Sequence, residues 1–183
     1  MLICKMKHKS GFVNIIGNPN VGKSTLMNSL IGQDLSIITS KAQTTRHRIK
    51  GILSNENYQI VFSDTPGVIK PAYKLQESMM QYVKSAFQDA DVIMYVVEIG
   101  EKGLKDNDIF EKIQQLKIPL IILLNKIDLV SQEKVLEEIE NWKSKFSTAK
   151  VLPISALNGF NIEEIVELIL DVLPESPPYY SKD

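Results

Sequence analysis

The chain has 183 residues, a length that favours one domain. It is 44% hydrophobic and 23% charged, which excludes an intrinsically disordered chain and a membrane-embedded one. Lys and Arg total 21 against 22 Asp and Glu, so the bulk charge excludes a strongly basic nucleic-acid wrapper. One cysteine and two histidines leave no internal disulfide framework and no Cys/His-rich metal centre. Because no apolar run approaches the ~20 residues of a membrane-spanning helix, we expect a cytoplasmic protein.

Short apolar runs alternate along the chain with segments of helical periodicity. The runs predict strands at 12–17, 49–53, 58–62, 92–97, 120–124 and 151–154. Helices with one apolar face are predicted at 26–31, 75–87, 109–116, 135–146 and 161–173, the last of them capped by Asn161. The turn at 54–57 predicts a hairpin, and the polar segment 33–46 predicts a loop. This order predicts an α/β fold, with a mostly parallel six-stranded sheet and helices on both faces.

A glycine-rich turn joins the first predicted strand to the first helix. It reads Gly17-Asn18-Pro19-Asn20-Val21-Gly22-Lys23-Ser24-Thr25 and matches the pattern G-x-x-x-x-G-K-[ST]. The glycines let consecutive backbone N–H groups and the positive end of the helix face a phosphate. Lys23 would place its charge on the β- and γ-phosphates, and the Ser24 hydroxyl would ligate Mg²⁺. The alternative, a glycine turn with a surface lysine, is disfavoured by the strand before the turn and the helix after it.

The run Asp64-Thr65-Pro66-Gly67 follows the third predicted strand. A carboxylate at this end of the sheet would hold Mg²⁺ through a water molecule, and the Gly67 N–H would bond the γ-phosphate. Alone, such a run is ordinary turn chemistry. Beside the glycine-rich turn, it predicts the metal arm of a nucleotide site and the start of a phosphate-sensing loop.

A base-recognising motif is predicted at Asn125-Lys126-Ile127-Asp128, after the fifth strand. The Asp128 carboxylate can accept hydrogen bonds from guanine N1–H and the exocyclic amine, whereas adenine offers no such pair of donors. Asn125 would steady the loop and contact the base, and the stem of Lys126 would cover the ring. Ser155 and Ala156 follow the last strand, where the Ala156 backbone N–H would reach guanine O6. A helix-capping Asp in a polar loop is the alternative for Asp128.

The basic segment 41–48 lies between the phosphate helix and the metal-arm strand. A solvated loop is the alternative to a functional one. A threonine in this place can complete Mg²⁺ coordination only when a γ-phosphate is bound, which makes such a loop an order–disorder switch. Thr45 is the preferred ligand, and Thr44 stays open as the other choice.

These motifs occur in the order found in the translation-factor-related GTPases, and within that class the chain resembles the Era family. The resemblance rests further on the runs Gln43-Thr44-Thr45-Arg46-His47-Arg48 and Leu173-Pro174-Glu175-Ser176-Pro177-Pro178-Tyr179-Tyr180, and it covers nearly the whole chain. It implies a P-loop NTPase with a Ras-like G domain. It also implies a bacterial GTPase that hydrolyses GTP to GDP and phosphate and acts in ribosome assembly.

The resemblance also implies a domain organisation and partners. Residues 1–10 would be an N-terminal leader, residues 11–174 the G domain, and residues 175–183 the start of a linker toward a C-terminal KH domain. The full-length protein would bind the small ribosomal subunit and its 16S rRNA, through a KH motif that this chain lacks. Peripheral contact with the inner face of the cell membrane is a further implication.

For hydrolysis, the resemblance assigns roles to Lys23, Thr45, Gly67 and Asn20. Ras-like enzymes orient the attacking water with a glutamine after the glycine of Asp-x-x-Gly, but the chain has Val68 there. Asn20 matches an asparagine that helps some relatives hold a potassium ion, which makes K⁺ a hypothesis beside GTP, GDP and Mg²⁺. We expect slow intrinsic hydrolysis, on the order of 10⁻⁴ to 10⁻² per second. A regulatory guanine-nucleotide-binding module without useful turnover remains the alternative.

Overall fold

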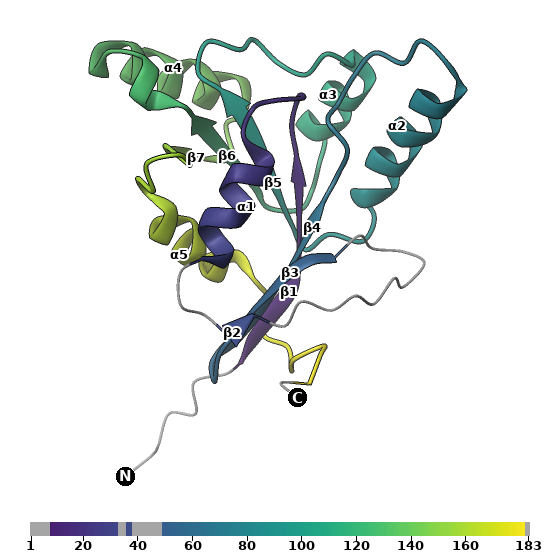
Figure 1. Ribbon diagram of the computed structural model, residues 1–183, viewed down its shortest axis with the longest axis vertical. Coiled ribbons are helices and arrows are strands. Elements are labelled where there is room, and N and C mark those ends of the chain that lie inside the picture. Colours follow the sequence, from purple (N-terminus) through teal and green to yellow (C-terminus); the bar gives the residue numbers. More distant parts are fainter. Residues whose placement is uncertain (1–7, 33–35, 38–48, 182–183) are drawn as a thin grey trace.

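The computed structural model describes residues 8–32, 36–37 and 49–181. After three consecutive strands in its first half, the chain alternates strands and helices (Figure 1). The strands are β1 (Lys9–Ile16), β2 (Ser36–Ile37), β3 (Ile49–Ser54), β4 (Tyr58–Asp64), β5 (Val92–Glu98), β6 (Leu120–Asn125) and β7 (Lys150–Pro153). The helices are α1 (Lys23–Ile31), α2 (Lys74–Ala86), α3 (Asn107–Gln114), α4 (Gln132–Lys145) and α5 (Ile162–Val172), with a 3₁₀ turn η1 at Ile127–Leu129.

Within the described residues, the strands form one sheet in the order β2-β3-β4-β1-β5-β6-β7. The pairs β4-β1, β1-β5, β5-β6 and β6-β7 are parallel, and β3 runs antiparallel to β4. Because right-handed crossovers put helices on the faces of a parallel sheet, the central strands are buried on both sides. The predicted α/β fold, with a mostly parallel sheet and helices on both faces, is therefore confirmed.

Two apolar clusters lie on opposite faces of the sheet. One packs α1 and α5 against the sheet, with Leu26 and Ile165 among its buried members. The other packs α2, α3 and α4 against the other face, around Val83, Ile109 and Trp142. Figure 1 shows α1 and α5 on one side of the sheet and α2 and α3 on the other. Alternate side chains of β5 enter the two clusters, which fixes the strand's register between the layers.

Three details differ from the predictions. The two-residue strand β2 lies within segment 33–46, which the sequence predicted as a loop, and it extends the expected six strands to seven by pairing with β3. Asn161 precedes α5, but its side chain makes no capping bond; its Nδ2 donates instead to the Pro153 carbonyl at 2.9 Å. In α2, Met80 is buried, whereas Leu75, predicted on the apolar face, is exposed.

The segment after α5 packs against the amino-terminal ends of β1 and β4, at the end of the sheet opposite the glycine-rich turn (Figure 1). Glu175 pairs with Lys9 in an antiparallel bridge, and the Ser10 hydroxyl donates to the Pro177 carbonyl. The rings of Phe12 and Tyr179 pack with their centroids 4.8 Å apart. The described part of this segment is thus docked on the domain. Among the described residues, no helix is both long enough and apolar enough to cross a bilayer.

Candidate functional site

The glycine-rich turn connects β1 to α1 in a close-fitting curve. Gly22 stands at the N-cap of α1 with φ 99°, a left-handed conformation that glycine adopts without steric cost. A Cβ at Gly22 would overlap Asn125 Nδ2, so both the turn's conformation and its packing require a glycine. The N-terminal end of α1 therefore opens at the carboxyl edge of the sheet, where its N–H groups can face an anion.

The Lys23 ammonium lies folded over the same turn. It donates to the carbonyls of Gly17 at 3.1 Å and Asn18 at 2.8 Å, and the residue is buried. Burial lowers the pKa of Lys23 from its ordinary value, while the nearby carboxylates of Asp64 and Glu101 act in the opposite direction. The turn thus holds a cation at the place where a phosphate would meet the helix end.

The segment Asp64-Thr65-Pro66-Gly67 lies directly against the glycine-rich turn. The Thr65 hydroxyl donates to the Ile15 carbonyl at 2.8 Å, and the Val68 N–H donates to the Gly17 carbonyl at 2.9 Å. A Cβ at Gly67 would come within 3.0 Å of Pro19. The two predicted motifs therefore meet backbone to backbone, as their positions on neighbouring parallel strands require.

A cavity of about 460 Å³ lies between these two motifs. Its walls include Lys23, Ser24, Asp64 and Gly67, together with Asn20. Its donor set of one carboxylate and one hydroxyl fits Mg²⁺, which binds hard oxygen ligands and keeps several positions for water and phosphate. The structure places the predicted phosphate and metal residues around one space. Thr45 and Thr44 lie outside the described residues.

The Val68 side chain is fully buried, in the cluster that includes Met80 and Val83 of α2. The position that holds glutamine in Ras-like enzymes therefore points into the core. Its backbone N–H is also occupied by the Gly17 carbonyl. A water molecule beside the phosphates would have to be oriented by other groups.

The loop after β6, which the sequence predicts to recognise the base, is organised by Asn125 and Asp128. Asn125 is buried, donates through Nδ2 to the Val21 carbonyl at 2.8 Å and accepts the Ala156 N–H through Oδ1 at 3.0 Å. Asp128 Oδ1 accepts the Ser155 hydroxyl at 2.6 Å. These bonds join the loop after β6 to the glycine-rich turn and to the loop after β7. A second cavity, of about 200 Å³, lies against this loop.

Two hydrogen bonds of this loop were not part of the prediction. The Ala156 N–H, predicted to reach guanine O6, donates here to Asn125. Ser155, predicted with Ala156 to bind the nucleotide, donates its hydroxyl to the Asp128 carboxylate. The exposed leucines Leu129 and Leu157 line the 200 Å³ cavity, and the sequence prediction missed both. Their position directly after the two polar motifs is the signal that could have identified them.

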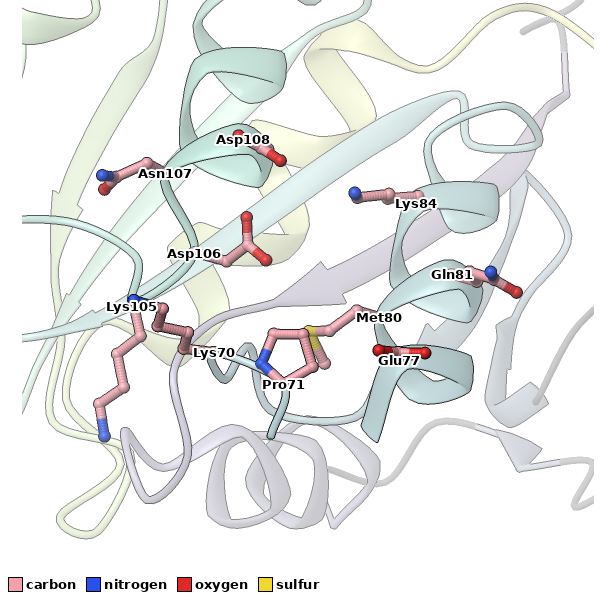
Figure 2. Close-up of a pocket in the computed structure, with 10 residues that line it drawn as sticks. All are labelled: Lys70, Pro71, Glu77, Met80, Gln81, Lys84, Lys105, Asp106, Asn107 and Asp108. Atoms are coloured by element: carbon pink, nitrogen blue, oxygen red, sulfur yellow. The ribbon is translucent and has the colours of Figure 1, made fainter. Parts of the chain in front are cut away.

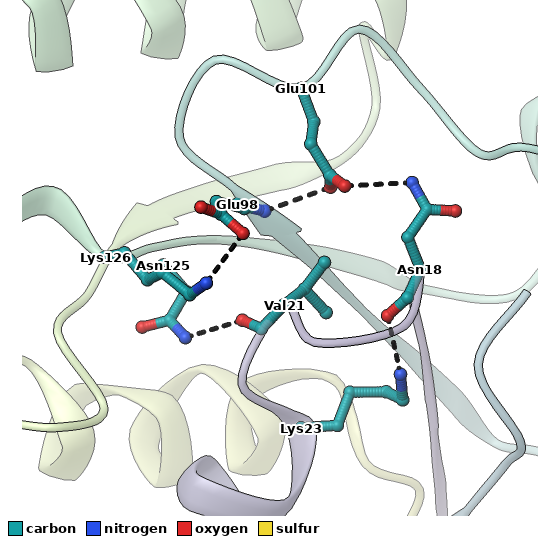
Figure 3. A network of polar contacts seen from close by, with 7 residues as sticks. All are labelled: Asn18, Val21, Lys23, Glu98, Glu101, Asn125 and Lys126. Carbon is teal, nitrogen blue, oxygen red and sulfur yellow. Dashed lines mark hydrogen bonds and ion pairs between the residues drawn. The ribbon is translucent and has the colours of Figure 1, made fainter.

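A polar network beside the site involves two glutamates that the sequence analysis also missed (Figure 3). Glu101 accepts Asn18 Nδ2 at 3.1 Å and the Glu98 N–H at 3.1 Å. Glu98 pairs with Lys126 at 2.7 Å. Lys126 has φ 66°, so a residue with a Cβ holds a left-handed conformation. No sequence pattern predicts these contacts, because Asn18 and Glu101 are 83 positions apart.

A third cavity, of about 560 Å³, separates α2 from α3 (Figure 2). Lysines and acids both line it, among them Lys84 from α2 and Asp108 from α3, with Met80 at its apolar side. Lys105 also lines it, and its backbone N–H donates to Asn18 Oδ1 at 3.0 Å. The segment that supports the glycine-rich turn therefore forms one wall of this cleft.

Comparisons with known proteins agree with this geometry. The family model described as 50S ribosome-binding GTPase matches residues 12–126. The structure of an Aquifex aeolicus Era variant bound to GDP and AlF₄⁻ is 40% identical over 96% of this chain and 60% of that chain, with a TM-score of 0.80. Era in complex with MgGDPNP and nucleotides 1506–1542 of 16S ribosomal RNA is 40% identical over 96% of this chain and 61% of that one, with a TM-score of 0.81.

A more distant match has the size of this domain. The FeoB G domain from Methanococcus jannaschii is 25% identical over 90% of this chain and 97% of that chain, with a TM-score of 0.63. The chain spans about three fifths of the length of the two Era chains. Because the matching model spans more than half of its residues, the chain belongs to the 50S ribosome-binding GTPase family, as a GTPase domain of the Era type.

Proposed function

We propose that GTP binds across the two adjoining cavities, with guanine against Asp128 and the phosphates over the glycine-rich turn. The observation that carries this proposal is the pair of bonds made by Asn125, which fix the base-recognising loop to Val21 and to Ala156. A purine and its phosphate tail need two sites at a fixed separation. A buried side chain that bonds both loops sets that separation. The Ser155 hydroxyl on Asp128 Oδ1 supports the same role, because it orients the carboxylate.

We propose Ser24 and Asp64 as the protein's Mg²⁺ ligands, Asp64 through a water molecule, with Thr45 as the third. When bound, the ion would neutralise charge on the β- and γ-phosphates. Within the described residues, no cluster of three or more His, Cys, Asp or Glu side chains could hold a metal by itself. A site with one carboxylate and one hydroxyl accords with Mg²⁺, which takes most of its remaining ligands from water and phosphate.

For hydrolysis, we propose that Lys23 and the N–H groups of the glycine-rich turn bind the phosphates as negative charge develops. The Gly67 N–H would bond the γ-phosphate. Because Val68 is buried, the attacking water would be held by backbone, by a second water or by a group from a partner. Asn20, exposed and with φ 66°, lines the phosphate cavity, which supports it as a potassium ligand. Equal turnover in K⁺ and Na⁺ would remove this role for Asn20.

We propose small-subunit ribosome assembly as the role of the whole protein, because a 40% identical Era is seen with a 16S rRNA fragment. Residues 175–183 as the start of a linker toward a KH domain stay a prediction, as does RNA binding outside this domain. Cytoplasmic location and peripheral membrane contact likewise stay predictions.

A nucleotide-competition measurement tests the proposed function. The purified chain, stripped of nucleotide, is titrated with a fluorescent GDP analogue and displaced with GTP, GDP and ATP, with Mg²⁺ present or chelated. We expect GTP and GDP to displace the probe at least 10³-fold better than ATP, because mismatched donors leave buried polar groups unpaired. Chelation of Mg²⁺ should lower the affinity for GTP more than the affinity for GDP. Equal displacement by ATP would refute the proposal.

A further inference from the structure

The last residue of β5 and the segment after it, residues 98–105, contact both halves of the proposed nucleotide site (Figure 3). Glu101 Oε1 accepts Asn18 Nδ2, and Glu98 Oε2 pairs with Lys126. The two glutamates are joined to each other, because Glu101 Oε2 accepts the Glu98 N–H at 3.1 Å. One short segment therefore links the phosphate-binding turn to the base-recognising loop.

On the phosphate side, the link passes through Asn18. This residue is only 3% exposed, and every polar group of its side chain is used. Its Nδ2 donates to Glu101 and to the Gly103 carbonyl at 3.0 Å, and its Oδ1 accepts the Lys105 N–H. The Asn18 carbonyl in turn accepts the Lys23 ammonium at 2.8 Å. A shift of Asn18 would therefore displace the lysine that faces the β- and γ-phosphates.

On the base side, the link passes through Lys126. Its left-handed backbone is disfavoured for a residue with a Cβ, so neighbouring contacts must hold it. The ion pair with Glu98 does so from the side chain, and the Ile99 N–H holds the Asn125 carbonyl at 3.0 Å from the backbone. Both members of the ion pair are about one-third exposed, which limits the strength of the pair.

We propose that Glu101 and Glu98 are positioning residues for the bound nucleotide, a role that rests on the proposed function. Glu101 acts on the β- and γ-phosphates through Asn18 and Lys23. Glu98 acts on the purine through Lys126. Because the two glutamates act on different parts of the ligand, nucleotides with one, two or three phosphates distinguish their roles.

The experiment measures the affinities of GMP, GDP and GTP for the purified chain, by displacement of a fluorescent GDP analogue. In Glu101→Gln, the amide keeps the shape of the carboxylate but can accept only one of the two N–H groups. We expect about fivefold weaker binding of GDP and GTP, since a buried donor loses its partner, and GMP affinity within twofold of the unmodified chain. In Glu98→Gln, we expect the affinities for GMP, GDP and GTP to fall by one common factor of about threefold.

A double-mutant cycle tests the route through Asn18. If Glu101 acts through this residue, Glu101→Gln should add less than a twofold loss of GDP affinity in an Asn18→Ala background. Thermal unfolding of the nucleotide-free variants separates loss of fold from loss of positioning. The matched control is Glu137→Gln, which removes the acid of an exposed ion pair with Lys134 on α4 and should leave all three affinities unchanged.

The outcomes separate this inference from the proposed function. Failure of the unmodified chain to bind guanine nucleotides would refute the proposed function itself. If the unmodified chain binds them, an equal loss of GMP and GDP affinity in Glu101→Gln would overturn the role of Glu101. Additive losses in the cycle would overturn its route through Asn18. A loss in Glu98→Gln that is restricted to GDP and GTP would overturn the role of Glu98.

Discussion

The Ser155 hydroxyl donates to Asp128 Oδ1 at 2.6 Å, so the carboxylate that faces the base cavity is held from a different loop. Asp128→Asn replaces an acceptor pair by one acceptor and one donor, which matches xanthine better than guanine. We expect this variant to lose at least 100-fold in GDP affinity and to gain affinity for XDP. Competition between GDP and XDP measures the change, and unchanged guanine selectivity would contradict the assignment of Asp128.

The same bond gives a separate prediction for Ser155. Ser155→Ala removes the donor and leaves the carboxylate free to rotate, so guanine affinity should fall about tenfold without any gain for xanthine. The Asn158 N–H, which donates to the Ser155 hydroxyl at 3.3 Å, also loses its acceptor. Calorimetric titration with GDP and XDP distinguishes this loss of orientation from the change of specificity in Asp128→Asn. If Ser155→Ala binds GDP like the unmodified chain, the hydroxyl does not orient Asp128.

The buried Lys23 predicts a pH dependence of stability. Burial lowers the pKa of Lys23 below that of the unfolded chain, so the unfolded state binds more protons between the lowered pKa and about 10.5. The charged lysine therefore costs stability at neutral pH, and this cost fades as pH rises through that window. We expect the unfolding free energy of the unmodified chain to rise relative to that of Lys23→Met between pH 7 and pH 10. Urea unfolding of the nucleotide-free proteins measures it, and a difference independent of pH would contradict the shift.

The sequence predicts those parts of the site that are formed by contiguous motifs. The glycine-rich turn places Gly22 and Lys23 by its own spacing, and the predicted motifs that lie within the described residues come at the carboxyl ends of parallel strands. Parallel strands with continuous apolar runs, such as β5, were equally clear. These features need no knowledge of distant residues.

What escaped prediction depends on tertiary packing. Glu101 contacts Asn18 only because the segment after β5 folds back over the glycine-rich turn. Asn161 has a left-handed backbone with φ 57° instead of the extended backbone typical of a capping residue, and its Nδ2 donates to the Pro153 carbonyl. The strand β2 has two residues and exists only through pairing with β3, so it has no periodicity to detect.

Val68 provides a test of how this site orients water. Its side chain is fully buried against α2, so a glutamine there would enter an apolar cluster and not the phosphate cavity. We expect Val68→Gln to lower the free energy of unfolding by about 1–3 kcal/mol and to leave the single-turnover hydrolysis rate no faster. Single-turnover hydrolysis of GTP also decides between a switch and a module without useful turnover. A stable Val68→Gln variant with faster hydrolysis would show that this side chain can reach the water.

Gln59 lies near the start of β4, at the end of the sheet opposite the glycine-rich turn, and allows a test of how the C-terminal segment is held. Its side chain is fully buried and hydrogen-bonds to the backbone of the docked C-terminal segment. Oε1 accepts the N–H groups of Tyr179 at 2.8 Å and Tyr180 at 2.9 Å, and Nε2 donates to the Tyr180 carbonyl at 2.9 Å. Gln59→Leu keeps the volume but removes these three bonds and the 3.4 Å bond from Nε2 to the Ser54 hydroxyl. We expect a loss of about 2–3 kcal/mol of stability.

The same variant should release the docked segment. Chymotrypsin should then cut at Tyr179 or Tyr180 at least tenfold faster, since cleavage follows the opened population. Gln114→Leu, at an exposed position of α3, is the matched control and should change neither property. GDP affinity should stay unchanged in both variants, because Gln59 lies near the start of β4 and the nucleotide site lies beyond its end. Unaltered cleavage in Gln59→Leu would mean that the ring contact between Phe12 and Tyr179 and the bonds of Ser10 hold the segment without Gln59.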